Sequence, residues 1–471
     1  MANTIHKSTA ELRAVLSQRQ NAASAKLAEK GKLTARARMD ILFDEGTFVE
    51  VGAYVSRKTT ELDTGADDSF EPVITGYGSV NGMLVFAFSQ DFSRLSGALG
   101  EMHAKKICDI LDKAMRAEAP VIGVFDSAGA KVLEGVDALA GYGKIMAKYA
   151  QAMYIPKIAV ISGPCGGSAA VIAKMSDIVI AAEKTGSLYM VPSSALTDKT
   201  LGTPARLASD GMCDLTAPDD ASAVALAGKI VGYFGKTIET GDDLNRTVDV
   251  ASIIGTDGYD VHDIINVVAD NGSFTELQAT HSAQMVIGLC TIGGKVTGVV
   301  ANNPAVKNGI VCPCAIEKAT DLINMCSYFD VPVLTLVDSC GVAEKDCVEE
   351  KQIEKKLASL ACAYADCDSA KVTVVLGKAY GTTYTVFGSK SVGADIALAL
   401  DSAKISALNP VKAVEFFGEV TDESKVDLTA DEWAAKYATP LEAAKGGHID
   451  DIIESCELRQ RIAASFEMLS M

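Results

Sequence analysis

The sequence has no apolar run long enough to cross a membrane as a helix. The longest candidate, between Lys157 and Lys174, is interrupted by glycine and proline at 163–167. The N-terminal residues MANTIHKSTAELRAVL lack the apolar core of a secretory signal peptide. Both absences lead us to expect a cytoplasmic protein.

Histidine and positive charge are scarce. None of the five histidines lies near a close pair of the 12 cysteines, so no metal site is expected. Without an export signal, the cysteines are predicted to be reduced thiols. The chain carries 43 Lys and Arg against 61 Asp and Glu, a net charge of -18. Such an acidic protein repels phosphate backbones, which argues against nucleic acid as a partner.

Length and glycine are what the chain has in abundance. Its 471 residues exceed one ordinary core and predict two domains, with a boundary within about 214–255. Short β-branched runs alternate with helical stretches such as 101–116 and 315–328. This alternation predicts parallel βαβ layers, an α/β fold. Further helices are expected at about 9–29 and over about 430–470.

The sequence also repeats itself. APVIGVFDSAG at 119–129 and VPVLTLVDSCG at 331–341 share an apolar strand, an Asp-Ser pair and a glycine, at an offset of 212. KIAVISGPCGGSAAV at 157–171 pairs with KVTVVLGKAYGTTYT at 371–385, at an offset of 214. Because order and spacing are kept, we interpret the chain as a duplicated domain.

Each repeat places a glycine-rich turn between a strand and a helical run. The first turn is Gly166, Gly167 and Ser168, and the second is Gly381, Thr382 and Thr383. Backbone N–H groups at a helix N-terminus, aided by the helix dipole, stabilise an oxyanion, and losing one donor costs about 3 kcal/mol. The alternative is that the glycines only permit close packing. Two turns at equivalent places favour two oxyanion sites.

A second candidate lies in SGALGEMHAKKI (96–107), which places His103, Lys105 and Lys106 near the start of a helix. Lysines there are suited to pairing with the phosphates of a nucleotide-like cofactor. The residues alone favour the alternative, a solvated helix face.

Conventional catalytic motifs are missing. No G-x-S-x-G elbow accompanies a plausible triad, and no P-loop or G-x-G-x-x-G opens a βαβ unit. Asp126 and Asp338 end strands, where a turn or cap role is at least as frequent, and Glu134 is interpreted as structural. The sequence thus offers backbone N–H groups that stabilise negative charge, but few side chains suited to act as acid or base. This combination suits a reaction in which a cofactor supplies the base.

Together, the motifs resemble the carboxyltransferase subunits of biotin-dependent acyl-CoA carboxylases and decarboxylases, typified by the propionyl-CoA carboxylase β subunit. The blocks that carry the resemblance are GKLTARARMDILFDEGTFVEVG (31–52), VITGYGSVNG (73–82), FSQDFSRLSGALGEMHAKKI (88–107), EGVDALAGYG (134–143), GPCGGSAA (163–170), GKAYGTTYT (377–385) and GGHIDDIIESCELRQRIA (446–463). The resemblance implies two tandem crotonase-like (ClpP/crotonase) α/β domains of the ββα-superhelix type, from an internal duplication. They would span 1–235, on the acyl-CoA side, and 236–471, on the biotin side.

The same resemblance implies transfer of a carboxyl group between carboxybiotin on a carrier protein and the α-carbon of an acyl-CoA. The released CO2 meets a thioester enolate after the biotin ureido nitrogen takes the α-proton. By motif match, Gly167 and Ser168 face the thioester, and Thr382 and Thr383 face the ureido oxygen. Expected contacts to biotin or coenzyme A come from Gly166, Lys105, Lys106, Ala128, Gly129, Gly381, Tyr384 and Thr385.

Partners are implied as well. Biotin is expected on a separate biotin carboxyl carrier protein, because no biotin-attachment Met-Lys motif in a suitable context appears. No ATP-grasp segment is present either, so a biotin carboxylase or a membrane decarboxylase subunit would be another chain. The family active site lies between subunits, which implies a homodimer at least and usually a hexamer.

Several positions depart from the family pattern. Gly381-Thr382-Thr383 replaces Gly-Gly-Ala, Thr385 replaces a frequent aspartate, and DSAGAK (126–131) replaces DSGGAR. Threonine's β-branching restricts the backbone and narrows a pocket, although the N–H groups remain. These departures leave acetyl or propionyl specificity open.

Three alternatives stay open. A sodium-pumping decarboxylase runs the same chemistry in reverse, from a malonyl-type or glutaconyl-CoA onto biotin. A biotin-independent crotonase-type hydratase or thioesterase would need positioned carboxylates beside one turn, and no convincing pair is seen. A non-catalytic subunit would have a Thr382-Thr383 turn that no longer receives biotin.

Overall fold

The chain divides into two compact units, Met1–Gly235 and Lys236–Met471, here called the N-terminal and C-terminal units. The computed structural model describes residues 8–56, 70–235, 237–238, 241–342, 352–420 and 429–470.

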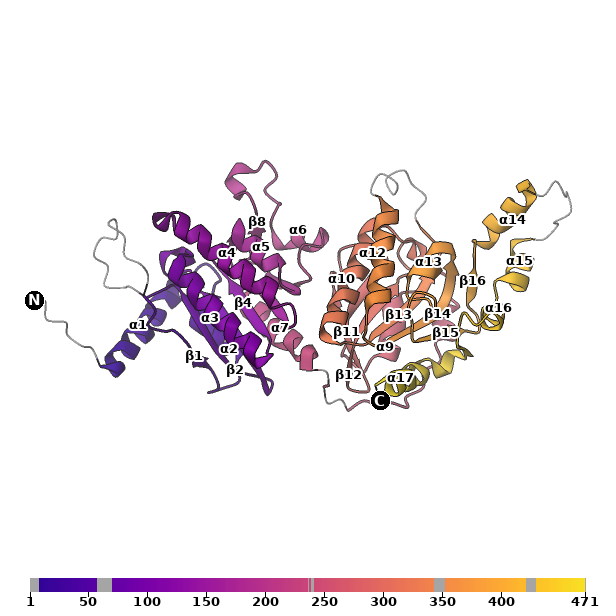
Figure 1. Ribbon diagram of the computed structural model, residues 1–471, viewed down its shortest axis with the longest axis horizontal. Coiled ribbons are helices and arrows are strands. Elements are labelled where there is room, and N and C mark those ends of the chain that lie inside the picture. The colour runs from indigo at the N-terminus through magenta and orange to yellow at the C-terminus, as the bar shows by residue number, and fades with distance from the viewer. Residues whose placement is uncertain are drawn as a thin grey trace, which may run out of the picture. The chain divides into compact units, whose positions relative to one another are not determined.

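A seven-stranded sheet forms the centre of the N-terminal unit (Figure 1). Its strand order is β1 (Val49–Glu50), β2 (Val73–Val80), β3 (Met83–Gln90), β4 (Val121–Phe125), β5 (Lys157–Ile161), β7 (Ile178–Ala182) and β9 (Leu215–Ala217). The first three strands are antiparallel, and the sheet is parallel from β3 onward. Strands β4, β5 and β7 are buried along their whole length, as parallel strands covered on both faces are.

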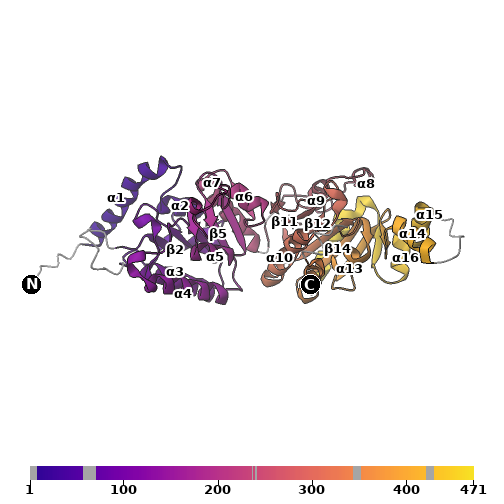
Figure 2. The ribbon, with the colours of Figure 1, turned by 90° about the horizontal axis from the view of Figure 1, so that it is seen from above.

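Helices cover both faces of this sheet. Figure 2 shows α3 and α4 on one side of it and α7 on the other. The helices of the unit are α1 (Thr9–Ala28), α2 (Ala35–Leu42), α3 (Glu101–Ala117), α4 (Val136–Gln151), α5 (Ser168–Lys174), α6 (Pro204–Ser209) and α7 (Asp220–Gly232). A separate parallel pair is formed by β6 (Pro164–Gly166) and β8 (Ser187–Tyr189). Strand β6 lies directly before α5 in the chain, and the first glycine-rich turn joins the two.

The C-terminal unit is built on a sheet of the same kind. Its main order is β10 (Thr275–Leu277), β11 (Met285–Ile292), β12 (Lys295–Asn302), β13 (Val333–Ser339), β14 (Lys371–Tyr380), β15 (Ile396–Leu400) and β17 (Asp451–Ile453), and β16 (Lys404–Ser406) pairs with β14. Its helices are α8 (Ala251–Ile254), α9 (Val261–Val268), α10 (Pro313–Phe329), α12 (Ile353–Asp366), α13 (Gly381–Val386), α14 (Pro410–Val420), α15 (Ala430–Tyr437), α16 (Pro440–Lys445) and α17 (Leu458–Leu469).

The two units repeat each other in detail, which confirms the predicted duplication. Each sheet begins with an antiparallel hairpin and continues in parallel. The β2–β3 hairpin turns at Asn81–Gly82 and the β11–β12 hairpin at Gly293–Gly294, all with positive φ. Asp44 accepts both N–H groups of the first turn, and Asp270 accepts both of the second.

Most predicted helices are found close to their expected bounds, but the C-terminal tail is not wholly helical. The stretches 101–116 and 315–328 are α3 and α10. Within 430–470, Asp451–Ile453 forms strand β17 and pairs in parallel with β15. Three residues carry no periodic signal, and the neighbouring strand selects their extended conformation. Within the described part of the chain, no helix is both long and apolar enough to cross a membrane.

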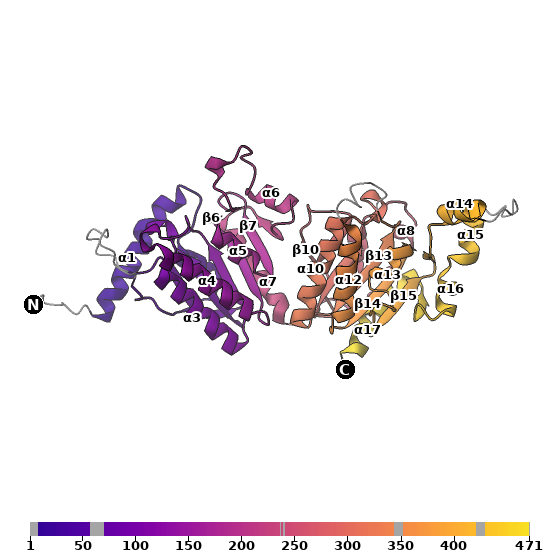
Figure 3. The ribbon, with the colours of Figure 1, turned by 45° about the horizontal axis from the view of Figure 1, so that its top comes forward.

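Two C-terminal helices form a small layer of their own. Figures 1 and 3 show α14 and α15 beside each other and away from α10 and α12. Trp433 packs there against Ala413, Ala434 and Ala438. The α14–α15 layer is followed by α16, which returns the chain to β17 through His448.

His262, the second residue of α9, lies between two carboxylates. Its Nδ1 is 2.6 Å from Asp260 Oδ1, and its Nε2 is 2.9 Å from Glu276 Oε2. The hydrogen bonds to Glu276 and Asp260 raise the pKa of His262 to about 9. The folded protein therefore favours the imidazolium more strongly than the unfolded chain does.

This geometry predicts a loss of stability at alkaline pH. Because the folded pKa lies above the ordinary value of 6.5, the stabilisation is complete below about pH 6.5 and is lost as the pH rises through about 9. We expect calorimetry to show the melting temperature of the C-terminal unit falling over that window. His262→Gln should remove most of the dependence, and an unchanged dependence in that variant would contradict the assignment.

Candidate functional site

The first glycine-rich turn joins β6 to α5. Gly167 is the N-cap of α5, with φ 58° and ψ -127°, a conformation that favours glycine. A Cβ built on Gly167 would meet no atom within 4 Å, so this face of the turn is open. At Gly166 a Cβ would instead overlap the ring of Tyr189. Gly166 therefore serves close packing, whereas Gly167 serves the backbone conformation of the turn.

The N–H groups of this turn are not equivalent. The Gly167 N–H donates to the Tyr189 carbonyl at 2.9 Å and joins the turn to β8. The first helical hydrogen bond of α5 runs from the Val171 N–H to the Gly167 carbonyl, at 3.3 Å. The N–H groups of Ser168 and Ala169 precede that bond and have no acceptor within the helix. Of the predicted pair, Ser168 is thus the residue whose N–H has no acceptor within α5, and its bond to a ligand remains a prediction.

A second loop lies against this turn. After β4, the Ser127 N–H donates to the Pro164 carbonyl and the Ala128 N–H to the Ser96 carbonyl, each at 2.9 Å. Gly129, with φ 120°, accepts from the Leu99 N–H at 2.9 Å, and a Cβ at Gly129 would meet nothing within 4 Å. The structure thus brings the predicted contacts Ala128 and Gly129 to the strand that enters the Gly166–Ser168 turn.

The acidic residues of this region are structural, as the sequence indicated. Asp126 is buried and pairs with Lys32 at 2.6 Å and Arg38 at 2.8 Å. Glu134 accepts from the Glu101 N–H at 2.6 Å, so it caps the N-terminus of α3. The structural interpretation of Glu134 is confirmed, and Asp126 proves to be part of a buried ion cluster.

The two lysines of α3 differ in role. Lys105 is exposed and pairs with Asp109 at 3.1 Å. Lys106 is buried, its Nζ donates to the Val73 carbonyl, and burial lowers its pKa to about 8. Lys318, at the same place in the second repeat, is also buried and donates to the Gln278 carbonyl at 2.9 Å. This shared anchoring favours a structural role for Lys106, and phosphate contact by Lys105 or Lys106 remains a prediction.

Substitution of Lys106 tests whether its role is structural. We expect Lys106→Met to lower the free energy of unfolding by about 1–2 kcal/mol, because the Val73 carbonyl loses its donor. The KM for an acyl-CoA should not change. Denaturant titration and initial rates measure the two effects. A raised KM with unchanged stability would return the Lys106 ammonium to the ligand site, and Lys113→Met, on the same helix, is the surface control.

The second glycine-rich turn joins β14 to α13. Gly381 opens it with φ 56°. Thr383 is buried and its hydroxyl donates to the Tyr380 carbonyl at 2.7 Å, whereas Thr382 is exposed. The Thr383 side chain therefore packs into the unit, so it does not narrow the space outside the turn. The backbone N–H groups of this first turn of α13 have no helical acceptor.

A cavity of about 450 Å³ lies beside this second turn. Its lining residues are Gly381, Tyr384, Thr385, Ile405, Ser406, Ala407, Tyr437, Glu442, Ala443 and His448. The Tyr384 hydroxyl donates to the His448 carbonyl at 3.3 Å, and burial raises the pKa of Tyr384. The sequence predicted Gly381, Tyr384 and Thr385 here. It missed the wall from α15 and α16, although the block 446–463 that carries His448 was a recognised motif.

Comparison with known proteins shows the family of the chain. The family model described as "Carboxyl transferase domain" matches residues 26–471. The chain is 35% identical over 469 residues to methylmalonyl-CoA decarboxylase subunit alpha of Propionigenium modestum, covering 93% of this chain and 90% of that protein. It is 32% identical over 464 residues to the propionyl-CoA carboxylase beta chain of Roseobacter denitrificans, with 93% and 91% covered.

Solved structures agree as well. Transcarboxylase 12S, with methylmalonyl-coenzyme A and methylmalonic acid bound, superposes with a TM-score of 0.92 at 29% identity, covering 99% of this chain and 97% of that one. The match confirms the predicted fold of two crotonase-like domains. The family model spans nearly the whole chain, and both repeats of the fold fall within it. The chain belongs to the carboxyl transferase domain family.

Proposed function

We propose that this chain is the carboxyltransferase subunit of a biotin-dependent acyl-CoA carboxylase or decarboxylase. The main support is similarity along more than nine-tenths of the chain to relatives of both kinds. Helices α5 and α13 add independent support, because each begins at a glycine turn and the two occupy equivalent places in the repeat. The reaction has two reactants, and each needs an oxyanion site. The relatives' names favour methylmalonyl-CoA and propionyl-CoA as the acyl-CoA pair.

In this proposal the N-terminal unit holds the acyl-CoA. The Ser168 N–H, at the positive end of α5, would stabilise the thioester oxygen as the α-carbon loses its proton. Gly167 keeps the approach to that N–H open. Ala128 and Gly129 would line the same approach, and Lys105 would meet coenzyme A at its phosphates.

The C-terminal unit would hold biotin. The cavity beside Gly381 has about 450 Å³ and a mixed wall of tyrosine, alanine and isoleucine, which suits a bicyclic ureido ring. The N–H groups of Thr382 and Thr383 would hold the ureido oxygen. Tyr384 and Thr385 would contact the ring from the first turns of α13. Carboxybiotin, when bound, supplies the carboxyl group and a ureido nitrogen that accepts the α-proton.

The proposal also assigns partners. Biotin would arrive on a separate carrier protein, and a biotin carboxylase or a membrane decarboxylase subunit would complete the complex. Transcarboxylase 12S is described as a hexamer assembly, and we expect a homo-oligomer here too. Every cysteine that the structure describes is free, which suits a reducing compartment and supports the cytoplasm.

Carboxyl exchange tests this function. The assay incubates the protein with free biotin and with malonyl-, methylmalonyl- or glutaconyl-CoA as the carboxyl donor. Acetyl- and propionyl-CoA, which have no carboxyl group to transfer, are the controls. Mass spectrometry follows loss of the carboxyl group from the thioester and its appearance on biotin. Transfer between methylmalonyl-CoA and biotin is the expected result. If coenzyme A thioesters bind but none exchanges, the alternative of a non-catalytic subunit is favoured. Co-purification with a membrane subunit or with a biotin carboxylase decides between decarboxylation and carboxylation.

A further inference from the structure

The repeat places two aspartates at equivalent strand ends, but gives them different partners. Asp126 and Asp338 are offset by 212 residues, and both are buried. Each lies against a glycine, since a Cβ at Gly163, just after β5, or at Gly377, within β14, would overlap the neighbouring carboxylate. The surrounding backbone is therefore conserved between the two units, and the charges around it can be compared directly.

In the N-terminal unit, Asp126 belongs to a four-member ion cluster. Lys32 follows the positive-φ residue Gly31, Arg38 is the fourth residue of α2, and Asp220 is the first residue of α7. Arg38 pairs with both Asp126 and Asp220 at 2.8 Å, and Lys32 pairs with Asp126 at 2.6 Å. Two cations thus balance two buried carboxylates, as buried charge requires.

In the C-terminal unit the same places hold neutral side chains. Tyr259 follows the positive-φ residue Gly258, Ile264 is the fourth residue of α9, and Leu458 is the first residue of α17. Tyr259 donates its hydroxyl to Asp338 at 2.9 Å, and the Lys378 N–H donates to the other carboxylate oxygen at 2.9 Å. Among the residues that the structure describes, no side-chain cation lies within 4 Å of this carboxylate.

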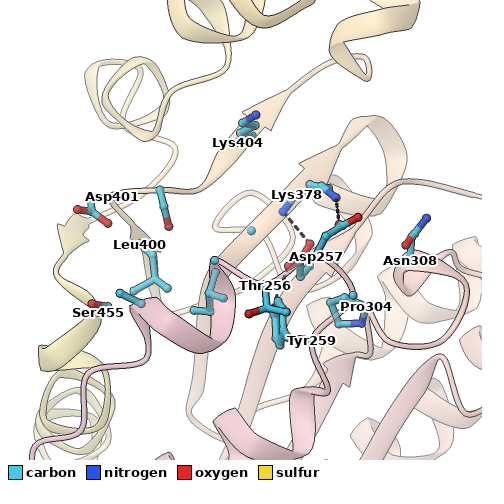
Figure 4. Close-up of a pocket in the computed structure, with 17 residues that line it drawn as sticks. Thr256, Asp257, Tyr259, Pro304, Asn308, Lys378, Leu400, Asp401, Lys404 and Ser455 are labelled. Carbon is cyan, nitrogen blue, oxygen red and sulfur yellow. Dashed lines mark hydrogen bonds and ion pairs between the residues drawn. The ribbon is translucent and has the colours of Figure 1, made fainter.

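A cavity of about 350 Å³ opens beside this unbalanced carboxylate. Its ionisable lining residues are Asp257, Asp338, Lys378, Asp401 and Lys404. Figure 4 shows Asp257 next to Lys378, with Asp401 across the cavity and Lys404 on its own strand. The Lys378 ammonium pairs with Asp257 at 3.6 Å.

We propose that this cavity is a binding site for a small zwitterion that carries a primary ammonium group and a carboxylate. The ammonium would take the role that Lys32 and Arg38 have in the other repeat and pair with Asp338. Each carboxylate oxygen has a second lone pair for such a bond. Three acidic groups against two lysines favour a cation in the cavity, and Lys404 is free to receive the carboxylate end. The site is separate from the cavity beside Gly381, with which it shares no lining residue.

Calorimetric titration of the full-length protein with three six-carbon probes tests this site, without biotin or coenzyme A. We expect 6-aminohexanoate to bind saturably, hexylamine to bind more weakly, and hexanoate not to bind. Asp338→Asn should weaken 6-aminohexanoate at least about tenfold, since a charge-assisted hydrogen bond is lost. No saturable binding of 6-aminohexanoate, or equal binding of hexanoate, would overturn the proposal.

A second variant keeps the test decisive if Asp338→Asn fails to fold. Lys404→Ala changes a side chain at the start of β16 and should weaken 6-aminohexanoate while leaving hexylamine unchanged. Lys412→Ala, on exposed α14, is the matched control and should leave both unchanged. Equal weakening by the two lysine variants would overturn the proposal. The outcome does not depend on carboxyl transfer, so the two hypotheses stand or fall separately.

Discussion

Gly167→Val is expected to lower carboxyl transfer by about 10²–10³-fold while leaving the protein folded. Valine is strained at φ 58° and ψ -127°, so the turn must shift and carry the Ser168 N–H with it. The new side chain would also project into the open face of the turn, where no atom lies within 4 Å. Carboxyl exchange measures the loss, and sedimentation with circular dichroism measures the fold.

Gly46→Val is the matched control for backbone strain. Gly46 also has positive φ, 74°, and a Cβ there would meet nothing within 4 Å, but it lies between α2 and β1. This variant should lose some stability and keep its exchange activity. Comparable activity losses in Gly46→Val and Gly167→Val would mean that strain, and not the oxyanion turn, accounts for the effect. Full activity in Gly167→Val would remove the turn from the active site.

The internal repeat predicted the architecture well, because each copy of a motif supports the secondary structure assigned to the other copy. The paired blocks around Asp126 and Asp338 fixed two α/β units and located a strand, a turn and a helix in each. The Gly167 and Gly381 turns were found for the same reason. Their positive φ values, 58° and 56°, agree with the choice of glycine at both places.

The repeat could not predict contacts between residues that are far apart in the sequence. The Gly167 N–H is engaged by Tyr189, 22 residues later, and no local spacing indicates the β6–β8 pairing. Lys106 was predicted to contact a phosphate from its position, and no local pattern indicated that α3 packs against β2 or that the Lys106 Nζ donates to the Val73 carbonyl. The periodicity of a helix predicts on which of its faces a residue lies, but it does not predict which strand or helix packs against that face.

The sequence also did not predict that Asp126 and Asp338 have different charged neighbours. Asp126 and Asp338 each begin an Asp-Ser pair at the end of an apolar run, so the sequence does not distinguish them. Arg38 lies 88 residues before Asp126 and reaches it only in the folded unit. The residue at the corresponding place of α9 is Ile264, which has no charge to offer Asp338. Burial raises the pKa of Asp338.

Arg38→Met is expected to lower the free energy of unfolding of the N-terminal unit by about 3–5 kcal/mol. Arg38 is 1% exposed and pairs with Asp126 and Asp220 at 2.8 Å. Methionine fills similar volume but leaves two buried carboxylates with the single ammonium of Lys32. The uncompensated charge, and not a cavity, causes the loss. Denaturant titration of the wild type and the variant measures it.

Arg38→Met with Asp220→Asn separates charge from packing. The asparagine keeps an acceptor for the Leu33 N–H, which donates to Asp220 at 2.9 Å, and removes the second negative charge. Lys32 then balances Asp126 alone, so the double variant should recover more than half of the lost stability. The C-terminal unit supports this expectation, because it combines an apolar Ile264 with the uncharged Leu458 at the same places. A double variant no more stable than Arg38→Met would mean that the guanidinium acts mainly through packing and its bond to the Gln90 carbonyl.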